Sequence, residues 1–505
     1  AARNTLLAAW GATRVLLVAG MLLGSPNAFC DPWFYHYAGQ LAAGQWPYRD
    51  FAVEYPPLAV LLILLPALPL LPFATLAPRP DPAFVEPLRS LPHPDPVRYG
   101  AYGISFAVEM LLLDLLALWL VRRAGQRLAP GDRYGLRSGL LYVGLIFLSG
   151  ALLQKFDLVA GVLCLAAVVA LVERRDALGW GALAAAALVK GFPVLALPVL
   201  VAYVVALAAW GKRAFDSGGA SAGRPYQRET WRRMRVGAAG FVVVTLVGVL
   251  PVLLAAGIGP LARAVLYHAD RATEIESLYG TLQLALGWLP GMATRTRFNY
   301  ADLSRVVRSP LDAATPALAV AALGLFLLLA YAGVWRALIA GAFSRRGVRR
   351  PPVSNGPPAA ARREGARVPK SVSRKDERAQ TLNSEDIVQS QAQALAVGVA
   401  AVLLAFTLAF RALPAHYLLV VVPLAAVIRL PRAPGRGQRI WLGALVGTAV
   451  VGQLLTAAWQ ALVALRPWAV ALLSIRNIAW VMAFGCLVVA LWHWPRSPAG
   501  GRRRG

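Results

Sequence analysis

Residues 30–58 read "CDPWFYHYAGQLAAGQWPYRDFAVEYPPL" and combine acidic side chains with one histidine and many aromatic rings. The carboxylates are Asp31, Asp50 and Glu54, and a strongly apolar run lies on each side of the segment. A positioned carboxylate can take the proton from a reacting hydroxyl, which is general-base catalysis. The segment is therefore predicted to be a catalytic loop held against a membrane.

The composition indicates a polytopic membrane protein. Of its 505 residues, 58% are hydrophobic and 15% are charged, with a mean hydropathy of +0.57, whereas a soluble chain carries about 25% charged residues. Apolar runs of about 20 residues, each long enough to cross a bilayer as a helix, recur along the chain. The net charge of +27 falls mainly in short loops between these runs. This pattern indicates orientation and contact with membrane lipids, not nucleic-acid binding.

The positions of the arginine-rich loops between the apolar runs predict a topology. Thirteen apolar runs occur, but the run at 57–77 contains four prolines, which interrupt helical hydrogen bonding. If that run is a re-entrant or interfacial helix, every arginine-rich loop falls on one side, the cytoplasm. The sequence then predicts an all-α bundle of twelve transmembrane helices, near 5–24, 100–121, 138–154, 157–172, 177–191, 193–210, 236–257, 314–338, 393–410, 414–430, 440–460 and 477–493.

The same topology predicts the domain organisation. A membrane core over 1–342 carries two outer loops, near 25–99 and 258–313, and both termini are cytoplasmic. Residues 343–392 are predicted to be a disordered cytoplasmic linker, and 393–505 the last helices with a basic tail. The first run is interpreted as a retained helix, not a cleaved signal. Three widely separated cysteines predict no disulfide framework.

Polar side chains gather on the predicted outer face, and the cytoplasmic loops show no glycine-rich phosphate loop. We expect a catalytic base and several substrate-binding groups among them. The catalytic candidate is Asp31. The substrate-binding candidates are Tyr35, Asp50, Glu54, Lys155, Asp157, Lys190, His268, Arg271, Glu276, Arg411 and His416.

This set of residue types suits transfer of a sugar from a polyprenyl-phosphate donor. Such a lipid-linked donor reaches a membrane-embedded site laterally, and nucleotide sugars are not available outside the cell membrane. Its leaving group is a phosphate, whose charge lysine and arginine can stabilise. One carboxylate then suffices to take the proton from the acceptor hydroxyl in an inverting displacement. No cofactor and no metal ion are expected.

Each candidate also has a structural interpretation. Asp31 precedes Pro32 and is placed to cap an interfacial helix, and Asp50 is placed to pair with Arg49 at the surface. Lys190 ends an apolar run, where lysines commonly snorkel to the interface, and the tyrosines and tryptophans fit an interfacial belt. The histidines His36, His268 and His416 show no zinc-ligand spacing.

Ionisable residues also occur inside predicted spans, where they are functional candidates by default. Arg14, Glu109 and Asp114 are such residues. Five positions separate the two acids, so they lie about 140° apart around a helix and do not share one face. A structural pair between Arg14 and one of them is favoured over a proton pathway.

Several motifs together resemble a known family. "PYRDFAVEYPPL", "LLLDLLALWLV", "KFDLVAGVL", "ALVKGFPVLALP" and "HADRATEIESL" follow in order, and the chain resembles the GT-C-type glycosyltransferases, in particular glycosyltransferase family 87. The similarity covers most of the chain to about residue 285 and resumes near 405. Where that family often has Ser-Pro-Gln-Tyr, this chain has "LPAHYLL".

The resemblance implies a GT-C fold and transfer of mannose from polyprenyl-phosphate mannose to an envelope glycolipid or glycan on the outer face. It implies that Asp31 is the base and that polar residues of both outer loops line the donor and acceptor sites. Two other interpretations remain open: a transporter or flippase, which would place its polar groups near the membrane midplane, and a non-catalytic scaffold. The sugar, acceptor, linkage and oligomeric state are not predicted.

Overall fold

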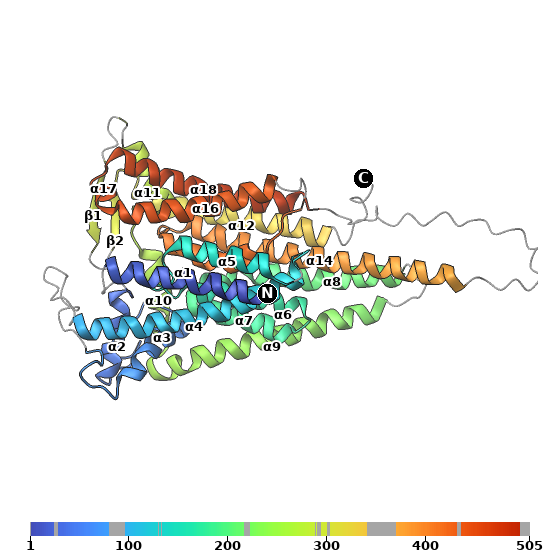
Figure 1. The fold of residues 1–505 in the computed structure, drawn as a ribbon, viewed down its shortest axis with the longest axis horizontal. Coiled ribbons are helices and arrows are strands. Elements are labelled where there is room, and N and C mark those ends of the chain that lie inside the picture. The colour runs from blue at the N-terminus through green and yellow to red at the C-terminus, as the bar shows by residue number, and fades with distance from the viewer. Residues whose placement is uncertain are drawn as a thin grey trace, which may run out of the picture.

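The computed structural model describes residues 2–24, 29–79, 96–129, 131–132, 134–216, 223–287, 289, 294–299, 304–340, 370–431 and 436–494. Long helices lie roughly side by side and form one elongated bundle (Figure 1). They are α1 (Ala2–Gly24), α4 (Pro96–Leu128), α8 (Leu197–Asp216), α9 (Gly223–Ala256), α12 (Thr315–Val334), α14 (Lys370–Ala409), α16 (Arg436–Ala457) and α18 (Pro467–Trp492).

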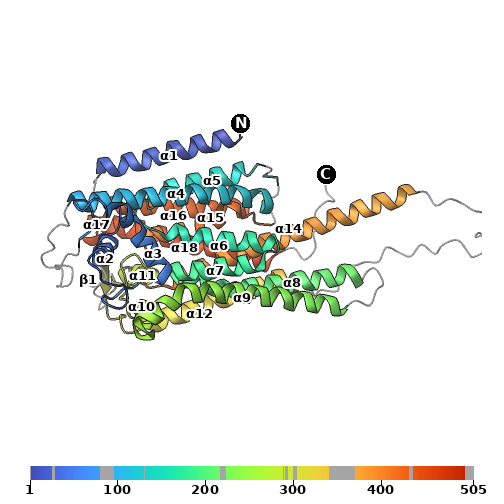
Figure 2. The same cartoon turned by 90° about the horizontal axis from the view of Figure 1, so that it is seen from below.

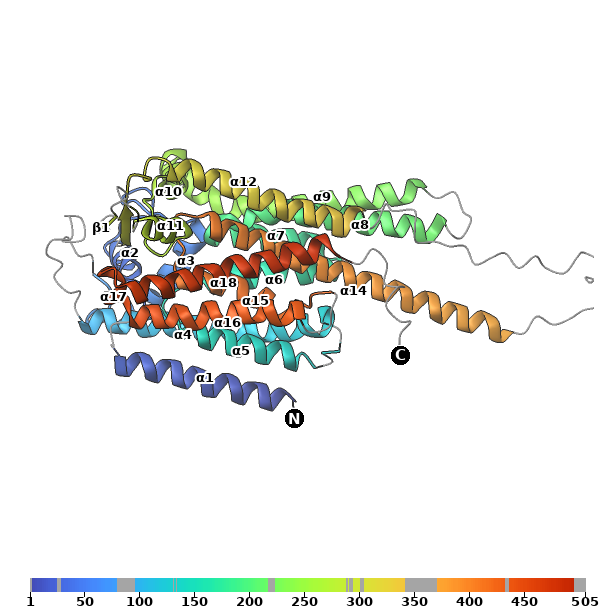
Figure 3. The ribbon, with the colours of Figure 1, turned by 90° about the horizontal axis from the view of Figure 1, so that it is seen from above.

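Shorter helices complete the bundle. They are α5 (Leu136–Ser149), α6 (Asp157–Val172), α7 (Asp176–Lys190) and α15 (Leu418–Val427), with the 3-10 helices η3 (Phe192–Ala196) and η7 (Ala415–Tyr417) and the π-helix η4 (Trp335–Ala340). All ten residues of α15 are buried, and its "LLVVVPLAAV" sequence is apolar on every side, as a central helix requires. By contrast, α1 lies at the flank of the bundle, where it packs against α5 (Figures 2 and 3).

The connecting elements between α1 and α4 and between α9 and α12 lie at the same end of the bundle, on the left in Figure 1. The start of α1, the end of α18 and the free end of α14 lie toward the other end. The left-hand elements are α2 (Pro32–Ala42), α3 (Pro57–Leu64) with η1 (Leu65–Leu70), α10 (Ile258–Asp270), α11 (Leu278–Leu286), β1 (Arg295–Asn299), β2 (Ser304–Arg308) and α17 (Trp459–Val463).

Among the described residues, eight helices are long and apolar enough to cross a membrane. They coincide with the predicted runs that begin near 5, 100, 193, 236, 314, 393, 440 and 477. The other four predicted spans fall on α5, α6, α7 and the segment Ala415–Val427, which are shorter helices of 10–17 residues. A predominantly helical chain with helices long and apolar enough to cross a membrane is thus confirmed, while twelve crossings and the re-entrant helix remain predictions.

Three details differ from the sequence-based expectations or refine them. The proline-rich run is α3 followed by the 3-10 turn η1, with Pro69 inside η1, because proline supplies no backbone donor. Residues 370–392, predicted to be disordered, belong to α14, and 341–369 lie outside the described residues. Strands β1 and β2 form an antiparallel hairpin, which the all-α prediction omitted.

Candidate functional site

Asp31 and Lys155 form an ion pair at the end of the bundle that carries α2 and α3. Lys155 Nζ donates to Asp31 Oδ2 at 2.5 Å, and the two side chains are 23% and 17% exposed. Asp31 also caps α2, because its Oδ1 accepts a hydrogen bond of 3.0 Å from the Trp33 backbone N–H. The capping interpretation is therefore correct, and it leaves the carboxylate partly exposed at the site.

A second ion pair joins the end of α7 to the start of α6. Lys190 Nζ lies 3.1 Å from Asp157 Oδ1. The ammonium group also faces the rings of Phe156, Tyr417 and Tyr55 at 5.0, 5.4 and 5.7 Å, which is cation–π geometry. Neither Asp157 oxygen has an aligned hydrogen-bond donor among the described residues, so the pair is held by charge and not by a directed bond.

The segment between α9 and α12 contributes an arginine between two acids. Arg271 pairs with Glu274 at 2.6 Å, and its charge also acts on Glu54 of the first loop. Arg271 Nε is buried with no hydrogen-bond partner among the described residues. This unused donor gives the guanidinium capacity to bind an oxygen of a ligand.

The pKa values follow from burial and these partners. Burial opposes ionisation of Asp31, but the charge and hydrogen bond of Lys155 outweigh burial and hold the pKa of Asp31 below its ordinary value. Burial likewise opposes the charge of Lys155, and Asp31 holds its pKa above the ordinary range. For Glu54 burial prevails over the attraction of Arg271, so its pKa is raised. Asp31 is therefore ionised at neutral pH, whereas burial favours the neutral form of Glu54.

His416 and Arg411 lie on the segment that follows α14. The charges of Lys155, Lys190 and Arg271 act on the ring of His416, which ties this residue to the same cluster. The backbone carbonyl of Arg411 accepts a hydrogen bond of 2.9 Å from the Glu274 amide. The predicted candidate His268 lies in α10, but its side chain is outside the described part of the chain.

Two other predicted site residues, Tyr35 and Asp50, make structural contacts, as does the nearby histidine His36. Tyr35 is 4% exposed and packs edge-to-face against Tyr99 and Tyr102, which does not fit contact with a substrate. Asp50 pairs at the surface with Arg49 at 2.8 Å, a contact that lowers its pKa to about 2. The surface interpretation therefore holds for Asp50. His36 is buried in α2, 3.4 Å from Gln40.

The partner of Glu276 is Arg476, a residue that the sequence analysis did not single out. Arg476 in α18 is fully buried and donates to Glu276 Oε1 at 2.9 Å, to the Glu276 carbonyl at 2.5 Å and to the Leu413 carbonyl at 2.9 Å. It thereby joins the segment between α9 and α12 to the segment before His416. An arginine inside the apolar run of α18 was the signal that would have identified it.

An apolar cavity of about 300 Å³ has Arg411 in its wall. It lies between α12 and α14, and its other lining residues are Pro316, Ala319, Val320, Leu323, Phe406, Ala409 and Phe410. Because the Arg411 carbonyl contacts Glu274, which pairs with Arg271, this cavity adjoins the charged cluster. The arrangement offers an apolar space next to partly buried cations.

The predictions for Arg14 and for the cysteines are confirmed. Arg14 Nε donates to Asp114 Oδ2 at 2.8 Å, and both side chains are buried. Trp10 and Tyr142 also donate to Asp114. The three cysteines are free.

The described residues contain no group of three or more histidine, cysteine or acidic side chains arranged to hold a metal ion. The charged cluster consists of Asp31, Glu54, Lys155, Asp157, Lys190, Arg271, Glu274 and His416, which come from segments far apart in the sequence. No protein-family model matches the chain, and no curated protein matches it.

Proposed function

We propose that the chain is an inverting glycosyltransferase that takes a sugar from a polyprenyl-phosphate donor. The acceptor would be an envelope glycolipid or glycan on the outer face of the cytoplasmic membrane, and the resemblance to family 87 favours mannose as the sugar. The observation that carries the proposal is the convergence of one ionised carboxylate, Asp31, with three partly buried cations, Lys155, Lys190 and Arg271.

The cations fit a phosphate leaving group. Lys190 has an ion pair without an aligned hydrogen bond, and Arg271 has a free Nε donor among the described contacts. Both can therefore donate to phosphate oxygens without breaking a directed bond. The apolar cavity beside Arg411 provides a place for the first units of a lipid chain, which a soluble nucleotide sugar would not need.

Asp31 has the properties required of the base. Each of its oxygens accepts one hydrogen bond, from Trp33 and from Lys155, and each retains a second acceptor position. The acceptor hydroxyl would lose its proton to Asp31 as its oxygen attacks the anomeric carbon. The bond from that carbon to the phosphate oxygen would break, and polyprenyl phosphate would leave with the electron pair. Lys190 and Arg271 would stabilise its charge.

The other acids have supporting positions. Asp157 is buried and would hold Lys190 without touching the sugar. Glu54 is partly exposed, and its raised pKa makes it a hydrogen-bond donor as well as an acceptor for a sugar hydroxyl. Arg476 and Glu276 would fix the second loop over the site.

The test is transfer of label from radiolabelled polyprenyl-phosphate mannose to membrane lipids, with membranes that contain the wild type, Asp31→Asn or Asp312→Asn. The Asp31→Asn exchange keeps the shape and removes the base, so transfer should fall about 10²- to 10⁴-fold. Asp312 pairs with Arg308 in a turn before α12, so Asp312→Asn should leave transfer unchanged.

Two results would contradict the proposal in different ways. Equal transfer by the wild type and folded Asp31→Asn would remove Asp31 as the base. Absence of transfer from any polyprenyl-phosphate sugar, together with movement of such a lipid across proteoliposomes, would favour a flippase.

A further inference from the structure

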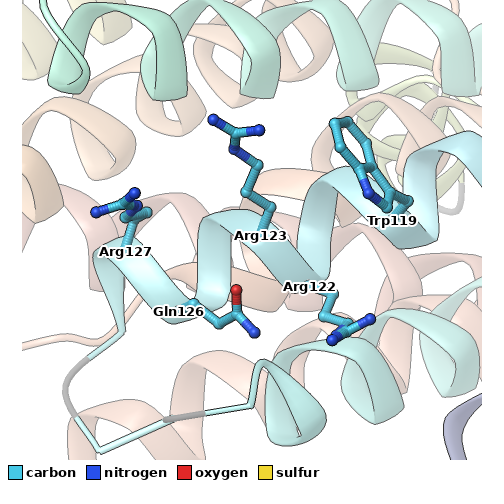
Figure 4. A pocket seen from close by; sticks show the side chains of 5 residues that line it. All are labelled: Trp119, Arg122, Arg123, Gln126 and Arg127. Carbon is cyan, nitrogen blue, oxygen red and sulfur yellow. The ribbon is translucent and has the colours of Figure 1, made fainter. Parts of the chain in front are cut away.

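A basic pocket lies on α4, at the end of the bundle opposite the charged cluster. Its volume is about 350 Å³, and it is lined by Trp119, Arg122, Arg123, Gln126 and Arg127. Figure 4 shows Trp119, Arg123 and Arg127 on one side of the helix and Arg122 and Gln126 on the other. These two rows have the i, i+4 spacing that places side chains along one helix face.

Two of the arginines are held by neighbouring segments. Arg123 donates to Glu173 at the end of α6, with a shortest distance of 2.8 Å. Arg122 donates to the Tyr134 carbonyl before α5 at 3.3 Å. Both guanidinium groups are thereby kept at the pocket and retain further N–H donors.

Arg127 has a different environment. It is exposed, and it has no hydrogen bond or ion pair within the described part of the chain. Glu173 is the carboxylate that contacts the pocket, and it is shared between Arg123 and Arg175. The lining therefore holds three arginines against one shared carboxylate, which leaves an excess of positive charge.

We propose that this pocket binds the phosphate headgroup of an anionic membrane lipid. Arginine forks match the geometry of phosphate oxygens. Trp119, which is 54% exposed, lies one turn from Arg123 toward the apolar part of α4, where an indole sits at the level of lipid headgroups. Basic pockets between membrane helices bind such headgroups. The inference does not depend on the proposed transferase activity.

The chemistry recognised is a phosphate group, so the experiment must separate a lipid from a free anion. Purified full-length protein in neutral detergent is titrated with phosphatidylglycerol, with phosphatidylcholine of the same acyl chains and with inorganic phosphate. Native mass spectrometry then gives the bound lipid and its apparent Kd. The variants are Arg127→Gln, the double variant Arg122→Gln with Arg127→Gln, and Arg308→Gln as a charge-matched control in β2.

Phosphatidylglycerol should bind the wild type more tightly than phosphatidylcholine. One arginine near an anionic lipid contributes about fivefold in affinity, so Arg127→Gln should weaken binding about fivefold and the double variant about 30-fold. Arg308→Gln should not change it. Arg127 has no partner among the described residues, so its replacement should not unfold the protein, and an unchanged melting temperature in phosphatidylcholine verifies this.

Equal binding of the two lipids, or phosphatidylglycerol binding that is unaffected by the double variant, would overturn the proposal. If inorganic phosphate displaces phosphatidylglycerol at equal concentration, the pocket recognises phosphate but not the lipid, and the lipid assignment is wrong.

Discussion

Lys155 Nζ lies 2.5 Å from Asp31 Oδ2, although 124 positions separate the two residues in the chain. The contact joins the cap of α2 to the turn between α5 and α6, and so it links the segment between α1 and α4 to the helical bundle. Because each charge stabilises the other, the pair stays ionised over a wider pH range than either group alone. This relationship determines how the proposed base responds to pH.

Lys155→Met should move the acid limb of the pH–rate profile to higher pH. In the wild type the pKa of Asp31 is below its ordinary value of 3.8, so the proposed transfer should be insensitive to pH through the weakly acidic range. Without Lys155, burial raises that pKa, and activity should fall as the medium is acidified from about pH 7 to about pH 4. Lys155→Arg keeps the charge and should keep the wild-type limb. If the profile were identical in Lys155→Met and the wild type, protonation of Asp31 would not control the rate of transfer, and Asp31 would not be the base.

Glu54→Gln should lower activity and raise the apparent melting temperature at neutral pH. Burial raises the pKa of Glu54, so its contribution to stability is present at low pH and is lost as pH rises through the raised pKa. The glutamine amide cannot ionise, so Glu54→Gln does not lose this stability at higher pH. Such a gain in stability with a loss of activity is common at functional sites. Two measurements test this: thermal unfolding in detergent at about pH 5 and about pH 8, and label transfer by the same variant. A lower melting temperature at both pH values would mean that Glu54 is mainly structural.

Asp114→Ala should destabilise the protein by roughly 3–5 kcal/mol, because it leaves a buried Arg14 without its partner. The double variant Arg14→Met with Asp114→Ala should recover much of the loss, since it removes both charges. Denaturation in mixed micelles measures the four members of the cycle. Glu109→Gln serves as the comparison, because Glu109 Oε2 has no hydrogen-bond partner among the described residues. Additive effects of the two single changes would contradict a coupled pair.

Arg476→Lys should not restore the function of Arg476. The guanidinium serves Glu276 and the Leu413 carbonyl at the same time, and one ammonium group lacks that fork geometry. Loosening of the second loop should raise KM for the donor about tenfold or more, with a smaller change in kcat. Steady-state kinetics at varied donor concentration separates the two parameters. A change in kcat alone would argue for direct contact with the reacting atoms.

The predicted topology can be tested by labelling with a membrane-impermeant maleimide. Ala43→Cys replaces an exposed residue and Glu229→Cys a half-exposed residue, at opposite ends of the bundle. In intact cells the first should react and the second should react only after permeabilisation, because the arginine-rich end is expected to face the cytoplasm. The native cysteines are buried or half-buried, and the unsubstituted chain provides the background. The reverse pattern would invert the topology.

The sequence by itself determined the class of the protein and much of its helical layout. Runs of about 20 apolar residues predict helices, and the predicted spans all coincide with helices of the described structure. It also predicted that Arg14 would pair with one of two buried acids, since an isolated charge in an apolar run is costly. The hairpin β1–β2 and the start of α14 were missed, because polar residues carry no periodic apolar signal there.

Tertiary structure alone decided which polar residues meet. Asp31, Lys155 and Arg271 are each compatible with a surface position in the sequence, and only the packing of α2, α6 and α10 at one end of the bundle brings their charges together. The same packing left Asp50 at the surface with Arg49 and buried Tyr35 among Tyr99 and Tyr102. Contacts across more than 100 positions depend on how helices pack, which local propensity and hydropathy do not encode.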